Sequence, residues 1–380
     1  MYSRQSIIHQ HVDRMIQDMP SPSKRLVAKG HLDGVSLCCT LLALKRGLNA
    51  EIATICGALH DIYTYKTGSS VNHGHNGAEM ARVVLKRLGD LFDDAETELI
   101  LSSIFHHSDK SEIHGPYEEI LKDADTLSPL LYDVALPPIN SPRRVRVESM
   151  ARELELLLEA GGIIDDPEFA EIPLHKTQEN RRAMLSETAA SLASAEIVGS
   201  RDDAAFMNLI RYFPEDNAAD ELINNWCAAF VYHCCQEVGF ILPIRWLTLP
   251  SRFAGISAWT AWAKKLSYFH EGKNGFLPQP GDIVVYNGII PVANRRADQQ
   301  HQAVDHMGIV VSCDGKELIA AEGNVDNCNV SGLVTRIVGQ NIEGYIRIDN
   351  AFSYDAWSFD YRAKTESPHQ PSFSPPVSST

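Results

Sequence analysis

The stretch that decides the second half of the chain spans positions 224–231 and reads Asn-Asn-Trp-Cys-Ala-Ala-Phe-Val. Its apolar residues predict a helix that begins near Cys227, and the side chain of Asn224 or Asn225 is expected to cap that helix. A thiol in the first turn of a helix lies at the positive end of the helix dipole, which favours the thiolate. The stretch therefore predicts a nucleophilic cysteine at a helix N-terminus.

A candidate base lies further along the chain, at the start of a β-branched run. His306 opens the sequence His-Met-Gly-Ile-Val-Val, which predicts a strand. A loop at 313–316 and a second apolar run from 318 predict a hairpin, so a polar residue at the end of the second run is expected beside His306. Glu322 or Asn324 would then orient the imidazole and complete a set of nucleophile, base and orienting group.

These motifs, with Pro-Gly-Asp-Ile-Val-Val at 280–285 and Gly-Tyr-Ile-Arg-Ile at 344–348, resemble a CHAP domain over about residues 187–350. CHAP is the amidase/peptidase branch of the NlpC/P60 papain-like superfamily. The resemblance implies a papain-like α+β fold with a central antiparallel sheet and no cofactor. It implies amide cleavage through an acyl-enzyme, most often in peptidoglycan. The residues implied are Cys227 as nucleophile, His306 as base, and Glu322 with Asn324 as polar partners.

Three features around this motif set have plainer interpretations. A free cysteine is more often a small buried hydrophobe than a nucleophile, and the chain has eight. Cys234 and Cys235 are accordingly expected to pack. The tryptophans at 246, 259 and 262 either line a substrate groove or, as is commoner for large aromatics, fill the core. The insertion at 294–303 either shapes substrate access or forms a surface loop.

Composition limits the classes of protein to which the chain can belong. A length of 380 residues predicts two or three domains, and a net charge of −15 argues against a nucleic-acid surface. We find no run of eighteen apolar residues and no signal-peptide core in the first nineteen, so we expect no membrane span and a cytoplasmic location. Cysteines without framework spacing indicate reduced thiols.

The first 130 residues are predicted to be almost wholly helical, with imidazoles and carboxylates at helix ends and in adjoining loops. Such ligands, with no thiolate in register, suit a divalent ion such as Mn²⁺, Fe²⁺, Zn²⁺ or Mg²⁺. An ion of this kind in a helical bundle can generate hydroxide and hold a phosphate oxygen. The residues in this set are His31, His60, Asp61, His73, His75, His106, His107, Asp123 and Asp125.

Their order, with flanks such as Ala-Leu-His-Asp-Ile at 58–62 and Lys-Asp-Ala-Asp at 122–125, resembles the HD phosphohydrolase superfamily over about residues 20–162. The resemblance implies an all-helical bundle. His75 matches no position of the family, and Asp123 matches one that need not touch metal. The ligands implied for one metal are His31, His60, Asp61 and Asp125. A second metal or a phosphate contact is implied for His73 with His106 or His107.

The chain is thus predicted to be a multidomain α and α+β protein. We expect an HD-type domain over 1–162, a linker over 163–186, a CHAP-type domain over 187–350 and a disordered Pro/Ser-rich tail over 351–380. The function expected is a bifunctional hydrolase that acts on a small phosphorylated substrate or nucleotide and on a peptide or peptidoglycan amide. The alternative is a non-catalytic HD module that senses a ligand and gates an amidase acting on a cytosolic amide. A wall substrate would be reconciled with a cytoplasmic location by non-classical delivery, through lysis, a holin or a secretion apparatus.

Overall fold

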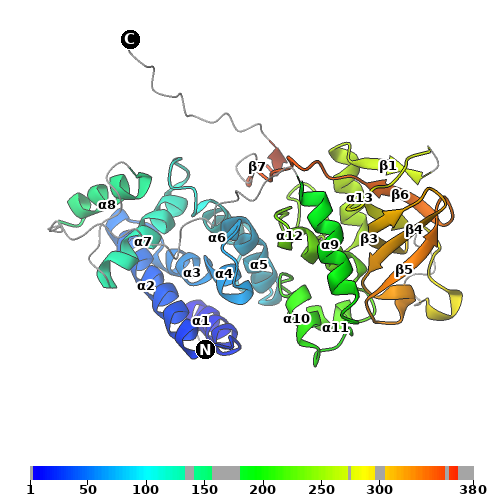
Figure 1. Cartoon of the computed structure of the whole chain (residues 1–380). Helices are drawn as coiled ribbons and strands as arrows, with labels where there is room; N and C mark the ends of the chain where they lie inside the picture. The colour runs from blue at the N-terminus through cyan, green and yellow to red at the C-terminus, as the bar shows by residue number, and fades with distance from the viewer. Residues whose placement is uncertain are drawn as a thin grey trace, which may run out of the picture.

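The computed structural model describes residues 3–132, 141–155, 180–272, 275–295, 304–355 and 359–366. Figure 1 shows a helical N-terminal half beside a C-terminal half built on a sheet. The helices of the first half are α1 (Arg4–Gln17), α2 (Pro22–Arg46), α3 (Ala50–Leu59), α4 (Ile62–Thr67), α5 (His73–Arg87), α6 (Asp94–His106), α7 (Pro116–Tyr132) and α8 (Pro142–Glu153).

Local sequence signals account for most of these helix ends. The side chains of Ser21 and Asn49 cap α2 and α3, and Gly47 ends α2 in the left-handed conformation that glycine adopts most readily. Asp93 and Glu96 form a capping box at the start of α6. The helix α4 was not predicted, because the chain resumes a helix directly after the His60-Asp61 doublet.

Among the described residues, the second half places five helices around a six-stranded antiparallel sheet of order β1-β6-β2-β3-β4-β5, so the predicted α+β architecture is confirmed. The helices are α9 (Arg181–Ala193), α10 (Ala204–Ile210), α11 (Ala218–Leu222), α12 (Cys227–Glu237) and α13 (Ile256–Lys265). The strands are β1 (Phe269–Glu271), β2 (Ile283–Tyr286), β3 (His306–Cys313), β4 (Glu317–Glu322), β5 (Gly332–Ile337) and β6 (Ile342–Ile346).

The predicted hairpin is formed by β3 and β4, which pair with Ile309 opposite Ala321. In Figure 1, α9 and α12 lie on the side of the sheet nearer the helical half. The buried residues Val231 of α12, Ala189 of α9 and Ile309 of β3 belong to one hydrophobic core. Trp259 and Trp262 are fully buried in this core, and Trp246 is nearly so. Cys234 and Cys235 are fully buried as well. Burial favours the packing interpretation of all these residues.

The two halves contact each other directly. The Asn76 side chain of α5 accepts a hydrogen bond from the backbone N–H of Ile244 at 2.9 Å. Glu79, one turn further along α5, forms a 2.9 Å ion pair with Arg245. The ammonium group of Lys66 at the end of α4 donates to the carbonyl of Phe213 at 3.0 Å. Helices that follow the His60-Asp61 doublet therefore form part of the contact with the second half.

The prediction of disorder from residue 351 onward is wrong for the residues described there. Phe352, Phe359 and Tyr361 are buried, and the short strands β7 (Phe359–Asp360) and β8 (Thr365–Glu366) pair with each other. Arg362 also binds Glu118 of α7 at 2.7 Å. Aromatic residues of this segment pack against both halves, Tyr361 against Phe105 and Phe359 against Trp246, which the Pro/Ser composition of the chain end concealed. Residues 367–380 lie outside the described part of the chain.

Two further expectations about segment boundaries were also tested in part. The predicted linker of 163–186 ends early, because α9 already begins at Arg181; residues 163–179 lie outside the described ranges. The helix expected near 188–197 is α9 itself, which ends at Ala193. Of the insertion at 294–303, residues 296–303 lie outside the described ranges.

One helix of the described residues, α2, is long and apolar enough to cross a membrane by length and composition alone. Half of its most apolar window is buried inside the protein. Leu32 and Val35 of this helix lie in the core of the bundle. A core helix passes the same test of composition, so the expectation that the chain has no membrane span stays a prediction.

Candidate metal centre and thiol active site

Four of the residues predicted to bind one metal meet between α2, the junction of α3 with α4, and α7. The Nε2 atoms of His31 and His60 lie 3.1 Å apart. Asp125 Oδ1 lies 3.4 Å from the first of these atoms and 3.5 Å from the second. Asp61 Oδ2 lies 3.6 Å from each. Two imidazoles and two carboxylates thus direct one ligand atom each toward a common point.

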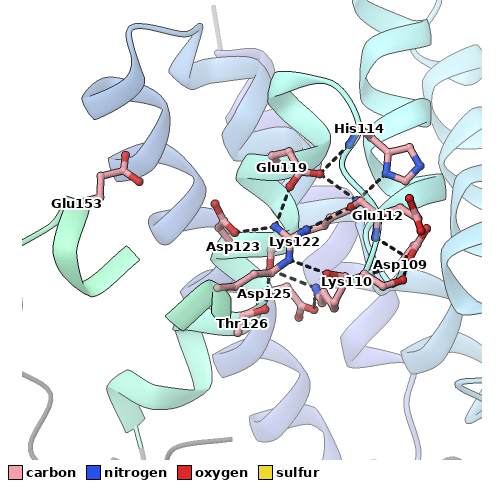
Figure 2. Close-up of polar contacts among 12 residues, drawn as sticks. Asp109, Lys110, Glu112, His114, Glu119, Lys122, Asp123, Asp125, Thr126 and Glu153 are labelled. Carbon is pink, nitrogen blue, oxygen red and sulfur yellow. Dashed lines mark hydrogen bonds and ion pairs between the residues drawn. The ribbon is translucent and has the colours of Figure 1, made fainter. Parts of the chain in front are cut away.

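The ring of His60 is held in the orientation that such a site needs. Its Nδ1 lies 2.8 Å from the Gly57 carbonyl oxygen, so Nδ1 carries the proton and Nε2 keeps its lone pair. Lys110 binds the other oxygen of Asp125, Oδ2, at 2.7 Å (Figure 2). Asp125 is therefore restrained to offer only Oδ1 to the cluster.

A second group of ligands meets at the other oxygen of Asp61. Asp61 Oδ1 lies 3.5 Å from His107 Nε2 and 3.7 Å from His73 Nε2. The Nδ1 atoms of these histidines donate to the Ile104 and Ser70 carbonyls, so both Nε2 atoms face the carboxylate as acceptors. Asp61 consequently lies between two groups of ligands and offers one oxygen to each.

His106 lies apart from this cluster although it neighbours His107 in the chain. Its ring packs on the ring of His114 at 4.0 Å between centroids, and its Nδ1 lies 2.9 Å from the Ser102 carbonyl. Of the two histidines between which the sequence did not choose, the structure brings His107 to Asp61. His75 packs against Phe105 and hydrogen-bonds to the hydroxyl of Tyr354, also away from the cluster.

The charges of the cluster are those of a cation site. Burial works to raise the pKa values of Asp61 and Asp125, but His60 beside Asp61 and Lys110 beside Asp125 hold them well below the ordinary value. Burial lowers the pKa of His107 to about 4, which keeps its imidazole neutral and able to ligate. Despite burial, Asp125 and Asp61 raise the pKa of His31 to about 10, as expected where a cation takes the place of the shared proton.

The donor set fits a divalent metal ion. Asp61 Oδ1 and His107 Nε2 are buried and make no hydrogen bond with any residue that the structure describes. Burying such atoms without a partner is costly, and a bound cation would satisfy both. Mixed imidazole and carboxylate ligands suit Mn²⁺, Fe²⁺, Zn²⁺ or Mg²⁺.

A network of charged residues on and around α7, which sequence analysis did not identify, supports the group of candidate metal ligands. Lys122 is fully buried and donates to His114, to Glu119 and to the Glu112 carbonyl (Figure 2). Asp123 is bound by Arg46 at 2.7 Å and by Arg146 at 2.9 Å, in agreement with the expectation that it need not touch metal. Lys122 and Asp123 lie three and two positions before Asp125, and each is bound by several partners. These contacts hold the turn of α7 that presents Asp125 in place.

The thiol site begins at the first residue of α12. Cys227 is 5 % exposed and occupies the first helical position, as predicted. The predicted asparagine cap is wrong: Trp226 is the N-cap residue and makes no side-chain cap, while the backbone N–H of Asn224 donates to Asn329. Asn224 has a φ of 61°, so the chain turns before it could cap the helix. No cap side chain of Trp226 therefore competes for the first N–H groups of α12.

The imidazole of His306 interacts with both the Cys227 thiol and a buried carboxylate. Its Nε2 is 3.0 Å from Glu322 Oε2, and its Nδ1 makes no hydrogen bond with any described residue. Burial opposes protonation, but Glu322 and Cys227 together raise the pKa of His306 to about 10. A charged imidazole beside a thiol favours the thiolate, which is the nucleophilic form.

Asn324 has a different position. Its Nδ2 donates to Asn327 and its Oδ1 accepts from the backbone N–H of Asn329, so both ends of the amide are engaged in the loop after β4. Of the two candidates for orienting the imidazole, Glu322 is the one that contacts His306. The hairpin alone left this choice open, because both residues lie near the end of β4.

Comparison with family models gives two matches within the chain. The HD domain model matches residues 29–130, and the CHAP domain model matches residues 219–324. Neither the curated proteins nor the solved structures gave a match. Both domain families are typically hydrolases, which makes the chain an enzyme of the hydrolase class. The protein is therefore a fusion of an HD domain with a CHAP domain.

Proposed function

We propose that the chain is a bifunctional hydrolase, with a metal-dependent phosphohydrolase in the HD half and a cysteine amidase or peptidase in the CHAP half. The HD substrate is inferred to be a nucleotide or another phosphoester, and the CHAP substrate an amide, with peptidoglycan as the first choice. The position of Asp61 between two ligand groups supports the first activity. The interaction of His306 with both Cys227 and Glu322 supports the second.

In the HD half, His31, His60, Asp61 and Asp125 would hold one metal ion, and Asp61, His73 and His107 a second. A bound divalent ion supplies Lewis acidity and lowers the pKa of coordinated water toward neutrality. The protein residues orient the ligands: Gly57 fixes the ring of His60, and Lys110 restrains Asp125.

The test of the HD half uses the full-length chain with Mn²⁺ or Zn²⁺. We expect titration calorimetry to show metal binding, and nucleotides or p-nitrophenyl phosphate to be hydrolysed. Asp61→Asn should abolish hydrolysis and weaken binding at both groups. Asp33→Asn is the matched control, because it makes the same change in a carboxylate of α2 that pairs with Lys29. Equal hydrolysis by the Asp61 variant and the wild type would refute the phosphohydrolase proposal.

In the CHAP half, His306 takes the proton of Cys227, and the thiolate attacks the amide carbonyl carbon. N–H groups at the start of α12 are inferred to stabilise the oxyanion. His306 then gives its proton to the leaving nitrogen, so the C–N bond breaks and a thioester remains on Cys227. Water attacks the thioester as His306 accepts a proton, which releases the carboxylic acid and restores the thiol.

Release of soluble fragments from purified bacterial sacculi tests the choice of peptidoglycan. Full-length wild type should release fragments whose masses identify the cleaved bond, and Cys227→Ala should release none. If neither protein releases fragments while Cys227 is selectively alkylated, the result would point to a cytosolic amide as the substrate instead. That result would also agree with the cytoplasmic location that we propose.

One observation favours a second function for the HD half, namely a ligand-sensing module that gates the amidase. Helix α5 begins with His73, which faces Asp61, and its next turns carry Asn76 and Glu79, which bind the CHAP half. If metal or nucleotide changes the rate of Cys227 alkylation while no phosphoester is hydrolysed, gating is the function. An unchanged rate would exclude it.

A further inference from the structure

Arg336 on β5 lies beyond the matched CHAP region, and its side chain ends at the carboxylate of Glu322. Its Nη2 donates to Glu322 Oε2 at 2.7 Å, and its Nε donates to Oε1 at 3.2 Å. Nη2 also binds Asp326 Oδ1 at 3.0 Å. The guanidinium therefore contacts both oxygens of Glu322, one of which is the acceptor of His306.

The register of the sheet explains how Arg336 reaches this position. Glu322 pairs with Gly332 at one end of the β4–β5 ladder, and Arg336 pairs with Leu318 four positions away. Because side chains alternate along a strand, Glu322 and Arg336 share one face of the sheet, with the small Ala320 between them. A long arginine side chain lying along this face spans the gap.

We propose that Arg336 is a positioning residue for the Cys227–His306 pair. Its hydrogen bonds to both oxygens of Glu322 keep Oε2 within hydrogen-bond distance of His306 Nε2. The inference rests on the proposed function of the thiol site. It assigns no direct contact between Arg336 and substrate.

The surroundings of Glu322 explain why such a residue is needed. The Glu322 side chain is fully buried, and a buried carboxylate without a cation takes up a proton instead of remaining charged. His306 must change its charge during turnover, so it cannot keep Glu322 ionised throughout. An arginine stays protonated at any pH of interest and matches the two oxygens of a carboxylate.

Packing leaves the carboxylate few other positions. A Cβ atom on Gly308 would come within 2.6 Å of Glu322 Cγ, so only a glycine of β3 leaves room for this side chain. The ring of Tyr286 on β2 stacks on His306 at 6.0 Å between centroids. The charged and titratable groups around Glu322 among the described residues are thus His306 from β3, Arg336 from β5 and Tyr286 from β2. Cys227 from α12 lies beyond the imidazole, and Asp326 lies beyond Arg336.

Alkylation of Cys227 by iodoacetamide, read by peptide mass spectrometry on the full-length chain, tests the inference without a known substrate. We expect Cys227 of the Arg336→Met chain to be alkylated at least about 10-fold more slowly than wild-type Cys227 at pH 7, which is the scale of the loss when a residue that orients a functional side chain is removed. Arg336→Lys keeps the charge but not the two-oxygen grip, so its rate should fall between the two. Cys313, at the far end of β3, serves as the internal reference thiol.

A matched control is available in the same sheet. Arg347 binds the fully buried Asp282 through both oxygens, at 2.9 and 2.6 Å, without contact to His306 or Glu322. Arg347→Met breaks an equivalent pair and should leave the alkylation rate of Cys227 at the wild-type value. A loss of folding stability by itself would change the alkylation rate of Cys227 in both variants alike.

The pH dependence of alkylation distinguishes positioning from a merely structural role. Burial works to raise the pKa of Glu322, whereas His306 and Arg336 hold it below its ordinary value. Without Arg336 the carboxylate should accept a proton at higher pH and release His306. The Cys227 rate, relative to Cys313, should then fall more steeply from pH 7 to pH 5 in Arg336→Met than in wild type.

A folded Arg336→Met chain with the wild-type rate and the wild-type pH 5 to pH 7 ratio would overturn the inference. If Arg336→Met does not fold, Arg336→Lys decides by the same two readouts. Wild-type Cys227 that reacts no faster than Cys313 would overturn the proposed thiol function and this inference together. A reactive wild type with an unaffected Arg336 variant would overturn the inference alone.

Discussion

Replacing Gly57 by alanine should loosen the metal cluster through a clash between two helix backbones. A Cβ atom at this position would lie 2.7 Å from the Cα and 2.9 Å from the backbone nitrogen of Ser36, so α2 and α3 would have to move apart. His31 follows α2 in that movement and His60 follows α3. The Gly57 carbonyl that orients His60, 2.8 Å from its Nδ1, shifts as well.

The size of the effect follows from two opposing contributions. Forcing a methyl group into a packed helix interface costs about 1–3 kcal/mol. Alanine in a helix recovers up to about 1 kcal/mol relative to glycine. We therefore expect the free energy of unfolding to fall by about 1–2 kcal/mol. The metal affinity should fall about 10-fold, the scale seen when the partners that orient a ligand are disturbed.

Gly30→Ala, on the same helix α2, is the matched control, since a Cβ atom there would have no heavy atom within 4 Å. It should raise the free energy of unfolding by about 0.5–1 kcal/mol and leave metal affinity unchanged. Urea unfolding followed by circular dichroism gives the first quantity, and calorimetric titration with Mn²⁺ gives the second. A Gly57 variant that equals wild type in both would refute the close approach of α2 and α3 as the support of the cluster.

Three further predictions address the histidines and the contact between the halves. His107→Ala should lower the bound Mn²⁺ per chain by about one equivalent, whereas His106→Ala should leave it unchanged; elemental analysis after dialysis measures both, and equal losses would contradict the assignment. Because the pKa of His306 rises from 6.5 to about 10 on folding, its protonated form stabilises the fold fully below pH 6.5, and this stabilisation is lost as pH rises toward 10. The difference in unfolding free energy between wild type and His306→Asn should accordingly shrink from pH 7 to pH 10 in urea titrations; a constant difference would contradict it. Arg245→Met leaves Glu79 with one arginine partner in place of two, so the melting temperature should fall by several degrees, and Glu79→Gln in the same background should recover part of the loss. Failure of that second change to recover any stability would show that the charge of Glu79 is not the cause.

Residues with unusual chemistry and regular spacing could be identified from the sequence. The His60-Asp61 doublet, the cysteine before an apolar helical run and the hairpin that follows His306 each depend on neighbours in the chain. Helix caps such as Ser21 and Asn49 are similarly local. The unpredicted helix α4 and the described residues 351–355 and 359–366 are different, because contacts with distant segments stabilise them.

The sequence by itself determined the two domains and singled out the candidate ligand types and the candidate thiol, since these depend on residue type and order. Only the tertiary structure decided between His106 and His107, because neighbouring positions of a helix point about 100° apart and packing selects which one faces Asp61. It likewise decided between Glu322 and Asn324 through the bonds that the loop after β4 makes with Asn324. Arg336 could not be found from sequence at all, because its link to Glu322 arises from the register of two strands.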